Sequence, residues 1–103
     1  MSDSTVPVYE WEDPDKYEML AWVKSSKRKK DILTSLADAP KNTNDFGDKW
    51  EVELETVRYH LEQLQHGGPE GEFPELIQVL TPSRKQYRLY GLTEEGSEVV
   101  EML

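Results

Sequence analysis

The sequence feature that most constrains the fold is an apolar seam in the middle of the chain. Apolar side chains recur there at intervals of three and four residues, at Leu54, Val57, Leu61 and Leu64. This spacing places them on one face of an α-helix. We expect that helix over residues 54–66, because the glycine-rich stretch 67–71 ends it. A helix with a single apolar face requires other elements to pack against.

A shorter helix is predicted just before it, over residues 44–50, with Thr43 as the N-cap. Only residues 51–53 separate the two helices, and such a short break makes them cross steeply, as in a helix-turn-helix unit. Gly47 lies inside the first helix, where glycine costs about 1 kcal/mol of helix propensity. A position without a side chain would let the second helix approach closely. The spacing alone also fits a weak helix end or a loop.

Capping signals, apolar periodicity and turn residues predict five further elements: helices at 15–24 and 27–38, strands at 76–80 and 86–90, and a last helix at 93–103. Helices followed by a hairpin and a final helix predict an α+β fold, mostly α, of the winged helix-turn-helix type. In this prediction residues 43–66 are the helix-turn-helix, residues 75–90 are the wing, and residues 93–103 are the C-terminal helix.

The length of 103 residues leaves room for one domain with one core. We expect that domain over residues 13–103 and a flexible acidic arm over residues 1–12, which show no periodicity. The absence of cysteine excludes disulfides, thiolate metal sites and cysteine nucleophiles. No apolar run approaches the ~20 residues that span a bilayer, and the first residues lack the pattern of a signal peptide. We therefore expect no membrane partner and a cytoplasmic location.

The net charge of −9 is unevenly distributed. Residues 1–23 carry six acids against one base, residues 91–103 carry four glutamates and no base, and residues 24–90 carry eleven acids and eleven bases. A DNA-binding surface is normally basic, but acidic flanks on a neutral module do not exclude DNA. Such an excess of acids is typical of proteins from salt-accumulating microbes. An ordinary acidic domain is the alternative.

The outward face of the helix at 54–66 is the first candidate binding surface. Opposite its seam lie the side chains of Glu55, Thr56, Tyr59, Glu62 and Gln63, with Arg58 on the flank. Arginine, threonine, tyrosine and glutamine suit contacts to phosphates or base edges in a major groove. A glutamate can accept a hydrogen bond from a cytosine amino group, but it also repels phosphates. A plain solvated face is the alternative.

Two basic clusters are further candidates. The predicted hairpin carries Arg84, Lys85 and Arg88, which suit phosphates or a minor groove, or keep the hairpin soluble. Residues 24–30 hold five of the twelve bases of the chain. For this second cluster, contact with phosphates competes with pairing to the acidic N-terminal flank.

Four segments together resemble winged-helix regulators of the ArsR- and MarR-like kind, especially those of haloarchaea. The segments are residues 56–64 for the recognition helix, Phe46, Gly47 and Trp50 before the turn, residues 87–96 for the second wing strand and the entry to the last helix, and residues 17–26 for the opening of the domain. The resemblance covers roughly residues 14–103. Three glutamates depart from the pattern. Glu51 stands where the turn usually has glycine, Glu53 replaces a serine or threonine cap, and Glu55 replaces a polar or basic contact.

The resemblance implies a homodimeric, repressor-type regulator that binds double-stranded DNA. We expect no metal and no cofactor, because the chain has no cysteine and no metal-ligand motif. An unidentified small-molecule effector is left open. The DNA-contacting residues that we expect are Thr43, Asn44, Glu55, Thr56, Arg58, Tyr59, Gln63, Arg84, Lys85 and Arg88. The dimer contact is expected at Tyr17, Leu20, Trp22, Val99 and Leu103.

Two other functions fit the sequence. A winged-helix module could dock a transcription or replication protein through its acidic face and apolar flanks. Arg58 discriminates, because DNA is favoured if it shares one concave positive surface with the hairpin bases, and protein docking if Glu55 and Glu62 dominate that surface. A weaker alternative is a small-molecule sensor with a pocket lined by Trp22, Trp50 and Phe73. No motif indicates an enzyme, and the two histidines show no metal-ligand spacing.

Overall fold

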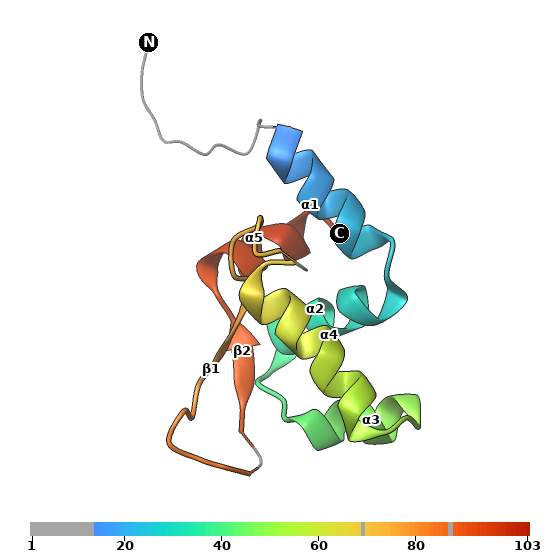
Figure 1. Cartoon of the computed structure of the whole chain (residues 1–103), viewed down its shortest axis with the longest axis vertical. Helices are drawn as coiled ribbons and strands as arrows, with labels where there is room; N and C mark the ends of the chain where they lie inside the picture. Colours follow the sequence, from blue (N-terminus) through green and yellow to red (C-terminus); the bar gives the residue numbers. More distant parts are fainter. Residues whose placement is uncertain (1–13, 69, 87) are drawn as a thin grey trace.

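The computed structural model describes residues 14–68, 70–86 and 88–103. Within them the chain forms five helices and a two-stranded antiparallel sheet (Figure 1). Their order is α1 (Pro14–Lys24), α2 (Lys27–Asp38), α3 (Thr43–Trp50), α4 (Leu54–His66), β1 (Ile77–Val79), β2 (Tyr90–Leu92) and α5 (Glu94–Glu101). The mostly helical α+β class predicted from the sequence is confirmed. The predicted arm, residues 1–12, and the predicted strand residue Tyr87 lie outside the described residues.

The core lies where α2 meets α4, β2 and α5. Helix α1 also packs against α2. The buried side chains of the core are Met19, Val23, Ile32, Leu33, Leu36, Phe46, Val57, Leu61, Leu64, Leu76, Ile77 and Val99. Ile32, Leu33 and Leu36 form the buried stripe of α2, and the last three positions of the seam of α4 are buried as well. Leu54 differs, because it opens the first turn of α4 and lies at the surface of the molecule.

The turn between α3 and α4 has the close geometry that the sequence predicts. Gly47 is buried, and a methyl group added there would lie 2.9 Å from the Cδ2 atom of Leu54. Close approach of the two helices therefore explains the glycine inside α3, as expected. Helix α3 ends at Trp50, and its C-cap residue Glu51 adopts the left-handed conformation with φ of 58°. Its position in the turn is the one where glycine was expected from the family resemblance.

The N-cap of α3 is Asn42, and the prediction of Thr43 as the cap was wrong. The Asn42 side chain accepts a hydrogen bond from the Asp45 backbone N–H at 3.0 Å, and the Asp45 carboxylate accepts one from the Asn42 N–H at 2.8 Å. This reciprocal capping box satisfies two backbone donors at once. Thr43 has no acid at the matching position three residues later, so the helix starts one residue earlier than predicted.

The hairpin pairs Ile77 with Leu92 and Val79 with Tyr90. The prediction of the second strand at 86–90 was wrong, because the ladder places β2 at Tyr90–Leu92 and leaves a long connection before it. Gly91 permits the pairing, since a methyl group there would lie 2.9 Å from a Leu80 side-chain carbon. One further backbone bridge joins Tyr90 to Lys41, the residue before the cap of α3.

Two ends of the molecule are distinct in Figure 1. The connection between β1 and β2 and helix α3 lie at one end, whereas α1 and α5 lie at the other. Over the described ranges, no helix combines the length and the apolarity that crossing a membrane requires.

Candidate nucleic-acid interface

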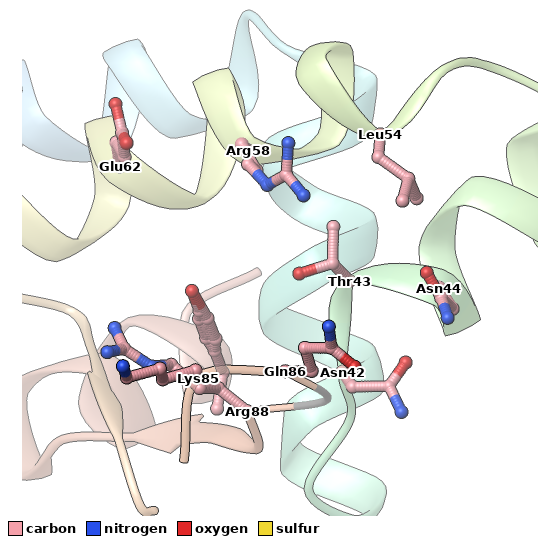
Figure 2. Close-up of a pocket in the computed structure, with 10 residues that line it drawn as sticks. Asn42, Thr43, Asn44, Leu54, Arg58, Glu62, Lys85, Gln86 and Arg88 are labelled. Atoms are coloured by element: carbon pink, nitrogen blue, oxygen red, sulfur yellow. The ribbon is translucent and has the colours of Figure 1, made fainter. Parts of the chain in front are cut away.

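A groove opens between the start of α3, the outer side of α4 and the hairpin connection. We call it the hairpin groove. Its lining comes from the α3 start (Asn42, Thr43, Asn44), from α4 (Leu54, Arg58, Glu62) and from the hairpin (Lys85, Gln86, Arg88, Tyr90). Its volume is about 480 Å³, and Figure 2 shows the side chains that line it. The site therefore joins segments that are far apart in the sequence.

Backbone hydrogen bonds hold the three walls together. The Tyr90 N–H donates to the Lys41 carbonyl at 2.8 Å, and the Lys41 N–H donates to the Tyr90 carbonyl at 3.3 Å. This bridge ties β2 to the residue that precedes Asn42, and the capping box then fixes the direction in which α3 leaves. The hairpin is thus docked beside the first turn of α3.

The hairpin connection has its own internal bonds. The Thr81 hydroxyl accepts a hydrogen bond from the Leu89 N–H at 3.0 Å, and the Thr81 carbonyl accepts one from the Arg84 N–H at 3.1 Å. The Arg88 Nε donates to the Arg84 carbonyl at 2.5 Å. These bonds order the segment that carries the basic side chains of the groove.

The charge of the hairpin groove is positive. Arg58, Lys85 and Arg88 line it together with a single acid, Glu62. Arg58 points from α4 toward Thr43, whereas the carboxylate of Glu62 points away from the hairpin (Figure 2). A concave surface with an excess of guanidinium and ammonium groups attracts phosphate oxygens.

Half of the predicted DNA-contacting residues line this groove, namely Thr43, Asn44, Arg58, Lys85 and Arg88. The other half lie outside its lining. Glu55 and Tyr59 are exposed on α4, Thr56 and Gln63 are half-buried on the same helix, and Arg84 is exposed on the hairpin connection.

Five lining residues are not among the predicted DNA contacts, although the sequence placed one of them, Glu62, on the outward face of α4. The other four are Asn42, Leu54, Gln86 and Tyr90. One signal was present for Asn42, because an Asn three residues before Asp45 matches a capping box and moves the helix start into the groove. Leu54 was assigned to the buried seam. Gln86 and Tyr90 enter the groove through the position of β2, which the local pattern did not indicate.

The side of α4 away from the hairpin carries an aromatic cluster around Trp50. The Trp50 ring lies 5.4 Å from the Phe46 ring and 6.1 Å from the His60 ring, edge to face in the second case. His60 in turn lies 5.3 Å from the ring of Tyr59, which is 58% exposed. The Arg28 guanidinium lies 5.3 Å from the centre of the Trp50 ring, in a cation–π contact.

Asp31 fixes the position of Trp50. Its carboxylate accepts a hydrogen bond from the Trp50 Nε1 at 2.7 Å and forms an ion pair with the Lys49 Nζ at 2.7 Å. Burial alone would raise the pKa of Asp31. The hydrogen bonds from Lys49, Trp50 and Ser35 and the charge of Lys49 outweigh burial and hold this pKa below its usual value. The carboxylate therefore stays charged and links α2 to the end of α3.

Two titratable groups beside this cluster have lowered pKa values. His60 is half-buried, its Nδ1 atom is buried, and no described residue supplies a hydrogen-bond partner for that atom. Burial lowers the pKa of His60, and the charges of Lys29 and Arg28 lower it further. Lys29 is buried with its ammonium 5.1 Å from the centre of the Trp22 ring, and burial lowers its pKa. Lys29 thus faces inward, unlike the rest of its basic cluster.

The predicted dimer residues fall into two groups. Tyr17 is 61% exposed and Leu103 is 40% exposed, while Leu20 and Trp22 are half-buried against the core. Val99 is fully buried inside the single chain, so its prediction as a dimer contact was wrong, because the side chain has no surface left for a partner.

The three aromatic residues predicted to line a sensor pocket take part in separate contacts. Trp22 packs on Phe73 with ring centroids 5.3 Å apart, whereas Trp50 packs on Phe46 and His60. Their contacts are those of core side chains.

No protein-family model, no curated protein and no solved structure matches this chain. The resemblance to ArsR- and MarR-like regulators therefore stays a prediction.

Proposed function

We propose that this protein is a sequence-specific, double-stranded DNA-binding transcriptional regulator with a winged helix-turn-helix fold. In this proposal α3 and α4 form the helix-turn-helix, α4 is the recognition helix, and the β1–β2 hairpin is the wing. The protein acts in the cytoplasm as a homodimeric repressor of the ArsR- and MarR-like, haloarchaeal kind. The proposal includes no catalytic step and no cofactor.

The observation that carries the proposal is the shared position of three bases. Arg58 of α4 and Lys85 and Arg88 of the hairpin line one concave surface, although the hairpin lies more than twenty residues further along the chain. Phosphate contacts of this kind fix the register of a protein on the duplex, and a helix beside them is then held in the major groove.

The start of α3 supports the same function. Thr43 and Asn44 line the groove in the first turn of a helix, where backbone N–H groups and the helix dipole favour an anion. Their hydroxyl and amide groups suit a phosphate oxygen, as Arg58 does on the facing wall. The groove thus presents neutral donors on one side and cations on the other.

The acidity of the whole chain is compatible with DNA binding in a salt-rich cytoplasm. At ionic strengths of 1 M and above, the Debye length falls to ~3 Å or less, so the acidic flanks repel a duplex only weakly. The same screening weakens long-range attraction. Affinity then depends on direct contacts such as those of Arg58 and the hairpin bases.

A protein-docking module is the second candidate, and the outer face of α4 favours it. Glu55 and Glu62 are exposed there beside Tyr59, an aromatic side chain that is 58% exposed. Acids around an exposed aromatic ring suit a basic protein surface as well as a base-pair edge.

Titration of the protein against a duplex from upstream of its own gene tests the proposal. Fluorescence anisotropy at several KCl concentrations, with unrelated DNA as competitor, measures both affinity and specificity. We expect Arg58→Ala/Lys85→Ala to weaken binding at least tenfold and to lower the slope of log K against log[KCl] by about 1.8, because two phosphate contacts are lost. Lys24→Ala, an exposed lysine outside the groove, is the matched control.

Two results would contradict the proposal. One is wild-type protein that binds no duplex at any salt concentration, which would favour protein docking. The other is DNA binding that the double substitution leaves unchanged while circular dichroism shows a folded variant.

A further inference from the structure

A second basic surface lies at the start of α2. Lys27, Arg28 and Lys30 line a shallow depression together with Asp31, Thr34 and Trp50. Lys27 and Lys30 are exposed, whereas Lys29 between them is buried against Trp22. Three of the four consecutive bases therefore face outward on one surface, which we call the α2 basic surface.

Aromatic contacts hold this surface beside α4. The Arg28 guanidinium lies over the Trp50 ring, Trp50 meets His60, and His60 meets the exposed ring of Tyr59. Asp31 anchors the Trp50 indole from α2 with a hydrogen bond of 2.7 Å. The chain of contacts runs from α2 to the outer face of α4, so the bases have a defined position relative to that face.

The α2 basic surface and the hairpin groove lie on opposite sides of α4. In Figure 1 helix α4 runs between the hairpin and the first turn of α2. Arg58, Lys85 and Arg88 belong to the hairpin side, and Arg28 belongs to the Trp50 side. Glu55 and Tyr59 are exposed on α4 itself. Across this face the charge is positive, then negative, then positive.

This order matches the cross-section of a DNA major groove. The groove is about 12 Å wide, and a phosphate backbone borders it on each edge. A helix with its side chains is about 10–12 Å across, so side chains on its two flanks face the two backbones. The base edges at the floor include the amino groups of cytosine and adenine, which donate to carboxylates.

We infer that Lys27, Arg28 and Lys30 bind the phosphate backbone on the edge of the major groove opposite to the one contacted by the hairpin groove. The inference rests on the proposed function, because it requires α4 to lie in that major groove. It assigns the α2 basic surface to a second row of phosphates and the exposed acids of α4 to the space between the two rows. The two basic surfaces on either side of α4 then clamp the duplex.

The test compares Lys27→Gln/Lys30→Gln with wild type on the same upstream duplex. Two lost phosphate contacts should lower the slope of log K against log[KCl] by about 1.8, while the preference over unrelated DNA is retained. Lys24→Gln is the matched control, since it removes a charge from the neighbouring helix end without touching either surface.

Phosphate ethylation interference locates the lost contacts. In the wild-type complex we expect interfering phosphates on both edges of one major groove. In the Lys27→Gln/Lys30→Gln complex one edge should stop interfering, and in the Arg58→Ala/Lys85→Ala complex the other edge should stop.

The outcomes separate the two proposals. An unchanged salt slope together with an unchanged interference pattern overturns the inference about the α2 basic surface and leaves the regulator function standing. Wild-type protein that binds no DNA overturns both. Loss of the same phosphates in both double variants also overturns the inference, because the two surfaces would then share one edge.

Discussion

Among single residues, Trp50 joins helix α3 to both α2 and α4. Its indole donates to Asp31, its ring packs on Phe46 and His60, and the Arg28 guanidinium lies over it. A tryptophan suits this place because it combines a large apolar ring with one hydrogen-bond donor. The alignment of the α2 basic surface with α4 therefore depends on a side chain that touches no DNA in the proposed complex.

His60, next to Trp50, should make stability depend on pH. Because its pKa is lowered in the folded protein, the unfolded chain takes up a proton first as the pH falls. The contribution of neutral His60 is complete above the ordinary histidine pKa of about 6.5 and declines as the pH drops below that value. Urea unfolding followed by tryptophan fluorescence between pH 8 and pH 5 should show this decline.

His60→Phe should flatten that decline, because an apolar ring of similar size keeps the packing and binds no proton. His66→Gln is the control, since His66 is exposed at the end of α4 and should leave the decline in place. If His60→Phe and wild type lose stability in parallel as the pH falls, His60 is not its source.

The turn between α3 and α4 holds one non-glycine residue, Glu51, in a strained backbone conformation that a substitution can relieve. Glu51 holds a left-handed backbone, which costs an L-residue with a Cβ roughly 1–2 kcal/mol, and glycine avoids that cost at some loss of entropy. Glu51→Gly should raise the free energy of unfolding by about 0.5–1 kcal/mol in urea titrations. Glu51→Ala keeps the Cβ and should give no gain. Equal stability of the two variants would contradict a backbone cost at Glu51.

The extent to which the sequence predicts each element follows from the range of the forces involved. The bounds predicted for helices 27–38 and 54–66 agree with α2 and α4, because caps and apolar periodicity are local signals. The start of α3 differed by one residue, since two neighbouring capping residues compete and only the pairing of Asn42 with Asp45 decides between them. The second strand was misplaced because its register depends on β1 and on the bridge to Lys41.

The residue types of the candidate site could be predicted from the sequence, but the convergence of these residues in one groove could not. The sequence predicted Arg58, Lys85 and Arg88 as separate DNA contacts, and the structure brings them into one groove. Their convergence depends on the bridge between Lys41 and Tyr90, a contact across almost fifty residues of chain. No local pattern contains that information.

In the whole molecule, the surface proposed for the dimer contact and the surface proposed for DNA lie at different ends. Helices α1 and α5 lie at the end away from α3 and the hairpin connection (Figure 1). Tyr17 and Leu103 expose apolar surface on the terminal elements of this end. A twofold contact there would leave the α4 face of each protomer free and direct the two faces to successive major grooves, about 34–36 Å apart.

Tyr17→Asp tests that contact, because a charge in an apolar interface destabilises association without entering the core of the single chain. Sedimentation and light scattering should show a dimer for wild type and a monomer for the variant at the same concentration. Tyr59→Asp is the matched control, since Tyr59 is equally exposed but lies on α4, and it should stay dimeric while losing DNA.

The spacing of the operator half-sites then gives an independent measurement of the dimer. Insertion of five base pairs between two half-sites rotates one of them by about half a turn of the duplex, so a rigid dimer can no longer contact both. Wild type should lose most of its affinity for the inserted duplex. Tyr17→Asp should bind both duplexes equally and weakly, because each monomer contacts one half-site. A wild-type protein that is indifferent to the insertion would bind as a monomer, and the exposed Tyr17 of α1 and Leu103 after α5 would then need another partner.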